Sequence, residues 1–126
     1  LSTNDATQQK PLGTVASGFE KDTFDTHTIA GAIEYIIAYA SETWNCPVAF
    51  YTGTKYDSEN YEAMVNALYQ VEGKWHIGVI DLWNNEEMNA VSPENYKLYM
   101  ADGIHPTLAG YRWWLPEFEK YLESAR

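Results

Sequence analysis

The sequence predicts an α/β fold, and three observations support that prediction. Residues 48–51 and 77–83 are short, nearly continuous apolar runs bounded by turn-forming residues, as expected for strands that are buried on both faces. Apolar residues at spacings of three and four surround these runs, which is typical of amphipathic helices. The alternation of helices with strands favours a parallel sheet that carries helices on its faces.

Composition limits the partners of the chain. Its 126 residues are 45% hydrophobic and 21% charged, which indicates one globular unit. The formal net charge of −10 argues against nucleic acid or an anionic membrane surface as a partner, because both bind basic patches. No apolar run reaches the roughly 20 residues that a membrane-spanning helix needs. The single cysteine, Cys46, excludes an internal disulfide and a cysteine-based metal cluster.

The first part of the chain is expected to contain a strand end, a long loop and a helix. Leu1 is expected to end a strand, and residues 6–24 lack sustained periodicity, so we expect them to form a substrate-shaping lid. The helix that follows has Asp25 or Thr26 as its predicted N-cap and ends near Thr43. Its predicted apolar face consists of Ile29, Ile33, Ile36, Ile37, Ala40 and Trp44.

A second helix follows the strand at 48–51. It is expected to begin near Asp57 or Ser58 and to end at Gly73, since glycine is a common C-terminal cap. Its predicted inner face consists of Tyr61, Met64, Val65 and Leu68. The strand at 77–83 then leads into a polar loop.

Two further helices are predicted in the last part of the chain. Ser92 is expected to cap a short helix with Pro93 at its first position, and Thr107 is expected to cap the last helix. Pro116 is expected to kink the last helix or to split it. The apolar face of the last helix is predicted from Leu108, Tyr111, Leu115, Phe118 and Leu122.

The predicted sheet is too small for the helices that need to cover it. Only two whole strands are visible, and parallel sheets are seldom that small. We therefore expect residues 1–126 to be the C-terminal portion of one larger domain, whose first strands precede Leu1.

Polar segments are predicted to meet at one edge of this sheet. In open α/β sheets the ligand site lies beyond the carboxyl ends of the strands, and residues 3–5, 52–54 and 83–85 follow strand ends. The turn that contains Asp102 and His105 lies in the connection between the last strand and the last helix. A carboxylate can accept the Nδ1 proton of a nearby imidazole, which leaves Nε2 free as a base.

Two segments resemble sequence blocks of a known enzyme family. Residues 102–106, Asp-Gly-Ile-His-Pro, resemble the last block of the SGNH hydrolases, the superfamily of GDSL-like esterases and lipases. Residues 2–5, Ser-Thr-Asn-Asp, resemble the third block, in which glycine commonly stands where this chain has Ser2. The blocks occur in the family's order and the resemblance spans nearly the whole chain. It implies a flavodoxin-like three-layer α/β/α fold.

The resemblance also implies a role for individual residues. His105 would be the general base of a serine ester hydrolase, Asp102 its orienting acid, and Asn4 an amide donor to the oxyanion. The family's Gly-Asp-Ser block, which carries the nucleophile, and its glycine block are absent from this sequence. We therefore expect both on the N-terminal part of the same protein, as a separate segment or chain, and we expect this chain alone to be inactive.

The resemblance leaves the substrate open among acylated carbohydrates, short-chain esters and lipids, and it implies no metal or organic cofactor.

Asp81 is expected to be a buried, hydrogen-bonded carboxylate within a strand, and His76 to have a structural role at the opposite sheet edge. Glu86 and Glu87 are expected in a solvated loop. Further candidates for lining the substrate are Thr3, Asp5, His27, Thr54 and Asn84.

Two other functions stay open at this point. The five Trp and ten Tyr residues are compatible with a non-catalytic module that binds carbohydrate or another ligand. Asp102, His105 and nearby acids are compatible with a metal site, although one histidine without a further ligand cluster is a weak signal for it. The compartment is also open. The low cysteine content fits a bacterial cytoplasm, and an export signal preceding Leu1 is the alternative.

Overall fold

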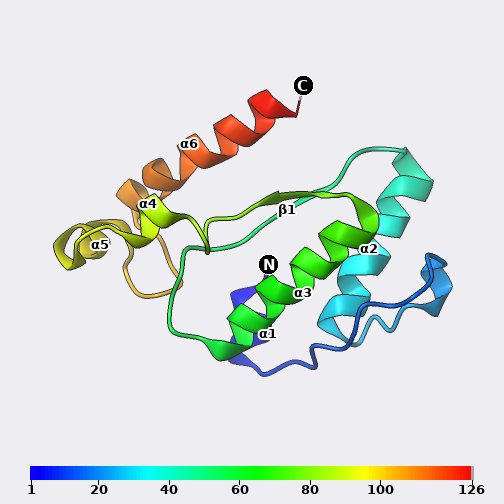
Figure 1. Ribbon diagram of the computed structural model, residues 1–126. Helices are drawn as coiled ribbons and strands as arrows, with labels where there is room; N and C mark the ends of the chain where they lie inside the picture. The colour runs from blue at the N-terminus through cyan, green and yellow to red at the C-terminus, as the bar shows by residue number, and fades with distance from the viewer. Residues whose placement is uncertain (126) are drawn as a thin grey trace. The chain divides into compact units, whose positions relative to one another are not determined.

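The computed structural model describes residues 1–125 and shows an α/β chain in which helices dominate (Figure 1). The chain forms two compact units. Unit 1 comprises Leu1–Phe50 and Ser58–Val79, and unit 2 comprises Tyr51–Asp57 and the chain from Ile80 onward. Within the part of the chain that the structure describes, no helix is both long and apolar enough to cross a membrane.

The strands β1 (Ala49–Tyr51) and β2 (Gly78–Ile80) form a two-stranded parallel sheet. The backbone N–H of Thr52 donates to the carbonyl of Ile80 at 3.1 Å. Both strands lie where the sequence predicts them, but β2 is shorter than predicted. The backbone hydrogen bonds between the two strands end at Ile80, because the backbone N–H groups of Leu82 and Trp83 donate instead to Oγ1 of Thr52, at 3.0 Å each.

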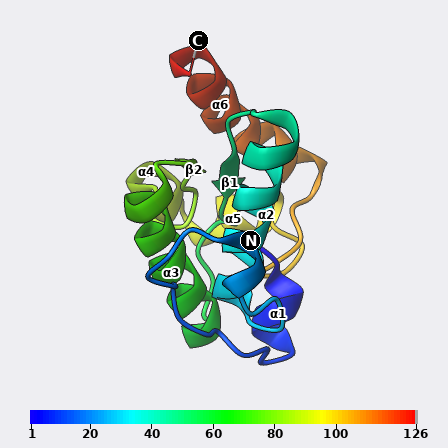
Figure 2. The same cartoon turned by 90° about the vertical axis from the view of Figure 1, so that its right-hand side faces the viewer.

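Unit 1 is built on two long helices that pack side by side, α2 (Ile29–Trp44) and α3 (Glu59–Trp75) (Figures 1 and 2). A short helix, α1 (Thr3–Thr7), packs against α3, and a single 3-10 turn, η1 (Lys21–Thr23), packs against α2. The apolar core includes Ala30, Ile33, Ile37, Tyr61, Met64, Val65, Leu68 and Val71. The predicted inner face of the second helix is therefore confirmed.

Three predicted boundaries in unit 1 are wrong. Residues 3–5 belong to a helix instead of a loop, because Oγ of Ser2 caps it by accepting the Asp5 N–H. The N-cap of α2 is Thr28, since Asp25 accepts the N–H of His27 in a turn before the helix. Helix α3 continues past Gly73 and ends where His76 adopts a left-handed backbone conformation, with φ of 55°.

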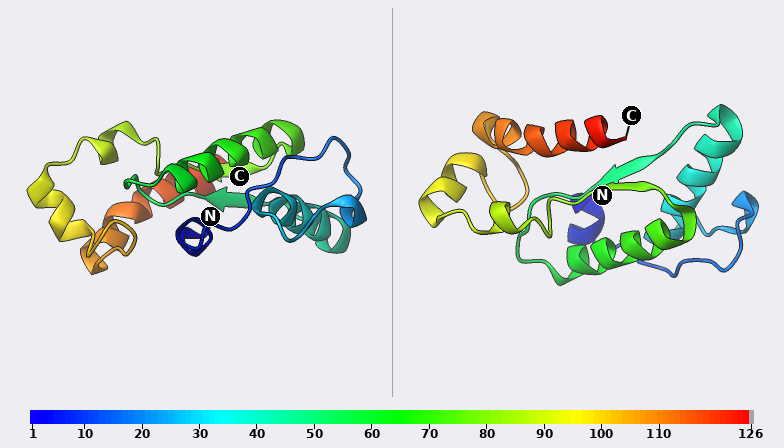
Figure 3. Two further views of the ribbon diagram at one scale, coloured as in Figure 1. Left: turned by 90° about the horizontal axis from the view of Figure 1, so that it is seen from below. Right: turned by 45° about the horizontal axis from the view of Figure 1, so that its top comes forward.

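Unit 2 contains α4 (Glu86–Asn89), α5 (Pro93–Tyr99) and α6 (Leu108–Ser124), and α5 packs against α6 (Figure 3). Ser92 and Thr107 cap their helices as the sequence predicts. Pro116 lies inside α6, which is one helix, so the predicted split is wrong, while the alternative of a kink stays a prediction. The buried centre of the unit consists of Leu82, Met88, Met100 and Trp114.

Gly110 allows the close approach of α6 to the end of α5. A Cβ at this position would lie 1.9 Å from the carbonyl oxygen of Tyr99 and 2.9 Å from Cβ of Pro106. Neither contact is possible, so a side chain here would push the last helix away from the turn that precedes it.

The apolar face predicted for α6 exists, but most of it is not covered. Leu108, Tyr111, Leu115 and Leu122 are 52–68% exposed. We call these four residues, together with Phe118, the α6 stripe. The stripe lines part of a cavity of about 400 Å³, whose lining residues are Tyr51, Tyr111, Arg112, Trp114, Leu115 and Phe118.

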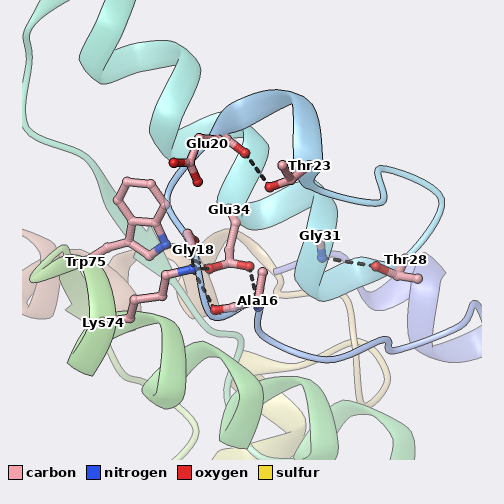
Figure 4. A network of polar contacts seen from close by, with 9 residues as sticks. All are labelled: Ala16, Gly18, Glu20, Thr23, Thr28, Gly31, Glu34, Lys74 and Trp75. Atoms are coloured by element: carbon pink, nitrogen blue, oxygen red, sulfur yellow. Dashed lines mark hydrogen bonds and ion pairs between the residues drawn. The ribbon is translucent and has the colours of Figure 1, made fainter.

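A buried polar network in unit 1 ties the segment before η1 to both long helices (Figure 4). Glu34 is fully buried, and its carboxylate accepts hydrogen bonds from the N–H of Ala16 and from Nε1 of Trp75, both at 2.9 Å. Nζ of Lys74 forms an ion pair with Glu34 and donates to the carbonyls of Ala16, at 2.8 Å, and Gly18. The network fixes the middle of the predicted lid segment to the helices of unit 1.

Candidate functional site

The predicted His–Asp pair lies in the short connection between α5 and α6 of unit 2 (Figure 3). The connection is closed at its base by an antiparallel bridge between Met100 and Pro106 and by a 2.9 Å hydrogen bond from Ala101 N–H to the carbonyl of His105. Thr107 then starts α6 and donates its own N–H to the carbonyl of Tyr99, at 2.8 Å. The turn is therefore held by backbone contacts on both sides.

Asp102 organises this turn through one carboxylate. Its Oδ1 accepts the backbone N–H groups of Ile104 and His105, both at 2.7 Å, and Nδ1 of His105 lies 2.9 Å from Oδ2. The hydrogen bond with His105, followed by those with the two N–H groups, lowers the pKa of Asp102 from 3.8 to about 2. Asp102 is therefore ionised at neutral pH.

The geometry defines what the imidazole of His105 can do. An ionised carboxylate at Nδ1 favours the tautomer that carries its proton there, so Nε2 is left as the acceptor. The His105 side chain is 73% exposed, and Nε2 is therefore accessible to a reacting hydroxyl. The pair can serve as a general base with its orienting acid.

The remaining predicted residues of unit 2 lie outside the turn that contains the pair. Thr54 is buried and donates to Sδ of Met100 at 3.7 Å, two residues before Asp102. Asn84 is exposed and donates to Asp81 through both its backbone N–H and its side-chain amide, at 3.0 and 2.8 Å. Asp81 is hydrogen-bonded as predicted, but it follows β2 and is only half-buried, because the strand ends at Ile80. Glu86 and Glu87 are exposed but open the short helix α4, where a loop was expected, because Asn85 caps it.

The other predicted residues belong to unit 1. Asn4 is exposed on α1, and its carbonyl accepts the Gln8 N–H at 2.9 Å. Thr3 and Asp5 lie on the same helix and are half-buried. His27 is exposed in the turn that precedes α2. These residues therefore belong to unit 1, whereas the His–Asp pair belongs to unit 2.

Sequence reasoning missed the role of Thr52. This side chain is fully buried, accepts the N–H groups of Leu82 and Trp83, and donates to Oδ1 of Asp81 at 3.1 Å. It thereby joins the segments that leave β1 and β2. A hydroxyl residue directly after an apolar strand was the available signal, because such a group can replace a ladder hydrogen bond.

The described residues do not gather into a cation site. Among residues 1–125, no three histidine, cysteine, aspartate or glutamate side chains lie together in a group that could hold a metal ion.

Comparisons with known proteins bear on the fold. No family model and no curated protein matches the chain. A crystal structure of a protein from Lactobacillus plantarum, solved by a structural genomics consortium, is 22% identical with a TM-score of 0.74; the alignment covers 96% of this chain and 62% of that one. A second crystal structure is 25% identical with a TM-score of 0.75, over 98% and 61% of the two chains. The chain therefore has an α/β fold that solved proteins share, and it spans about three-fifths of their length.

Proposed function

We propose that the chain is the C-terminal portion of a serine ester hydrolase of the SGNH type, in which His105 is the general base and Asp102 its orienting acid. The observation that carries the proposal is the 2.9 Å contact between Nδ1 of His105 and Oδ2 of an ionised, turn-locked Asp102. A base with a fixed tautomer and an accessible second nitrogen is what acyl transfer to a hydroxyl nucleophile requires.

The proposed reaction has two steps. Nε2 of His105 removes the proton of a serine hydroxyl as the serine oxygen attacks the ester carbonyl, and the same proton then passes to the leaving alcohol. Water repeats the sequence on the acyl-enzyme and releases the acid. Asp102 stays ionised and stabilises the imidazolium that forms in each step.

Asn4 is proposed as a donor to the oxyanion of the tetrahedral intermediate. Its side-chain amide would act with two backbone N–H groups of the N-terminal part of the protein. One such donor lowers the barrier by roughly 3–4 kcal/mol. This assignment rests on the resemblance of residues 2–5 to the family's third block, and Asn4 lies at an exposed position on α1.

We further propose that the N-terminal part supplies the serine, the oxyanion glycine and the missing strands of a flavodoxin-like three-layer sheet. Two observations support this. The α6 stripe is an apolar face that this chain leaves open, and burial of such a face stabilises a domain by about 25 cal/mol per Å². The two solved structures of the same fold are longer than this chain.

The test uses the longer protein that includes the segment preceding Leu1. We expect it to hydrolyse p-nitrophenyl acetate and to react with a fluorophosphonate probe, and we expect the His105→Ala variant to lose both activities. The matched control is His76→Asn, which replaces an exposed histidine by a residue that tolerates the left-handed conformation at the end of α3. Full hydrolysis by His105→Ala would refute the proposal, and a longer protein that does not react with the probe would favour the ligand-binding alternative.

A further inference from the structure

A second cavity of unit 2, of about 390 Å³, lies among the segment after β1, α4, α5 and α6. We call it the lysine cavity. Its lining residues include Thr54, Lys55, Asn89, Tyr96, Lys97 and Trp113.

The charge of the lysine cavity is opposite to that of the chain. The chain has 8 Lys and Arg residues against 18 Asp and Glu residues, yet the described residues that line this cavity include two lysines and no carboxylate. Nζ of Lys55 lies 5.9 Å from the centre of the Trp83 ring, a cation–π contact that restricts the side chain. Both lysines are exposed, and an ammonium group binds phosphate or carboxylate oxygens through charge-assisted hydrogen bonds.

An aromatic side chain, Trp113, also lines the lysine cavity. The half-buried ring of Trp113 stacks on Tyr99, with centroids 4.5 Å apart and an interplanar angle of 17°. Asn89 is fixed by a 3.0 Å hydrogen bond from its side-chain amide to the carbonyl of Trp83. An aromatic wall next to cations suits a ring that carries a negative charge.

The lysine cavity adjoins the His–Asp pair through α5. Tyr96 lines the cavity, and burial together with the charge of Asp102 raises the pKa of its phenol. Thr54, which also lines the cavity, donates to Sδ of Met100 at the start of the turn. A molecule in the cavity is therefore close to the turn that presents His105.

We propose that the lysine cavity is a binding site for an anionic ring, that is, a phosphate or carboxylate attached to an aromatic or sugar ring. Lys55 and Lys97 bind the anion and Trp113 contacts the ring. The proposal rests on the proposed function in one respect: in the hydrolase, this anionic ring is the part of the ester that lies away from the reacting carbonyl. Lys55 and Lys97 are then specificity-determining residues for charged esters.

The binding test uses the chain of 126 residues and three probes: phenyl phosphate, benzoate and neutral benzyl alcohol. Binding is followed by the ¹⁵N–¹H NMR signals of the tryptophan indoles, with Trp113 assigned from a Trp113→Phe variant. We expect at least one of the two anions to shift the Trp113 signal and benzyl alcohol to leave it unchanged. The anion that binds more tightly distinguishes a phosphate site from a carboxylate site.

The control variants separate a specific site from general charge effects. Lys55→Gln with Lys97→Gln is expected to weaken anion binding about tenfold or more, because two charge-assisted hydrogen bonds are lost. Lys21→Gln with Lys120→Gln removes the same charge from residues that form ion pairs with Glu42 and Glu117, and is expected to leave binding unchanged. Equal binding by both double variants, equal shifts with benzyl alcohol, or no shift with either anion would overturn the proposal.

The two proposals fail in different ways. His105→Ala is expected to leave anion binding intact, since His105 does not line the lysine cavity. Anion binding in a longer protein that does not react with the fluorophosphonate probe would overturn the hydrolase alone. Ester hydrolysis that depends on His105 without any anion binding would overturn the lysine cavity alone.

Discussion

Nδ1 of His105 lies 2.9 Å from Oδ2 of Asp102, and the same carboxylate accepts the backbone N–H of His105 through Oδ1 at 2.7 Å. One acid thus fixes both the backbone and the ring of the histidine. Replacing Asp102 by Asn separates the two contacts. An amide oxygen can still accept the backbone N–H of His105, but an amide cannot replace the carboxylate in its contact with the ring.

Asp102→Asn is expected to preserve the conformation of the turn but to remove the orientation of His105 that a general base needs. The amide oxygen can still accept the N–H groups of Ile104 and His105, but one amide cannot also orient the imidazole as a carboxylate does. In the longer protein, kcat/KM is expected to fall roughly 10⁴-fold, against roughly 10⁶-fold for His105→Ala. Steady-state ester hydrolysis measures both values. Equal losses in the two variants would contradict an orienting role for Asp102.

The pKa of Asp102 is expected to depend on His105. It lies near 2 because of the hydrogen bond with the imidazole and two backbone N–H groups. His105→Ala removes the largest cause, so the pKa is expected to rise while staying below 3.8. Since the pKa is lowered in the folded chain, the contribution to stability is complete above pH 3.8 and is lost as the pH falls toward 2. Titration of the ¹³C carboxyl signal measures the shift, and an unchanged midpoint would refute the assignment.

Lys74→Met is expected to destabilise unit 1 strongly. It leaves the fully buried Glu34 without its cation, and removal of one partner of a buried ion pair costs about 3–5 kcal/mol. Lys120→Met is the matched control, because its ion pair with Glu117 is exposed on the lysine side and such pairs contribute about 0–1 kcal/mol. Urea unfolding gives both values. A similar loss in the two variants would show that the buried network does not stabilise the unit.

Gly110→Ala is expected to displace α6 from the turn that carries His105. The added Cβ would overlap the carbonyl oxygen of Tyr99, so we expect a loss of about 2 kcal/mol or more in the free energy of unfolding. Gly73→Ala is the control, since, apart from the neighbouring residues and backbone of α3 itself, no heavy atom of the described residues lies within 4 Å of its Cβ position. At this position alanine is expected to increase the free energy of unfolding by about 0.5–1 kcal/mol. Thermal unfolding compares the two, and a neutral Gly110→Ala would contradict the close approach.

Leu115→Lys is expected to prevent association with the N-terminal part of the protein. Leu115 lies within the α6 stripe and is 52% exposed, so the change affects the chain itself by less than about 1 kcal/mol. Ala109→Lys adds the same charge at an exposed position of α6 outside the stripe. Co-purification of the two separately expressed parts is expected to be lost only with Leu115→Lys. Loss with both variants, or with neither, would argue against the stripe as the interface.

Local signals in the sequence predicted the local features of the fold. Ser58, Ser92 and Thr107 cap their helices as expected, because a hydroxyl residue directly before a segment of helical apolar periodicity commonly acts as its N-cap. The errors at Asp25 and Gly73 arose because a residue three positions further along the chain starts or ends the helix instead. The stronger competitors were the hydroxyl of Thr28 and the left-handed conformation of His76.

Contacts between distant segments could not be predicted in this way. Glu34 and Lys74 are separated by 40 positions, and only the fold brings them together. Glu34 did carry a signal, since it is a charged residue among the buried positions Ile33 and Ile37 of an apolar helix face. Within the candidate site, the contact between Asp102 and His105 was predictable because both lie in one turn. Asn4, by contrast, belongs to unit 1 and the turn to unit 2, so no local signal joins them.

The locality of the turn also affects the order in which the protein is assembled. Contacts between residues close in sequence form before those that must close long loops. The hydrogen bonds of Asp102 to residues 104 and 105 span only a few positions, so the imidazole acquires its orientation early in folding. In the proposed hydrolase, the base is then already oriented when the N-terminal part that would supply the nucleophile arrives.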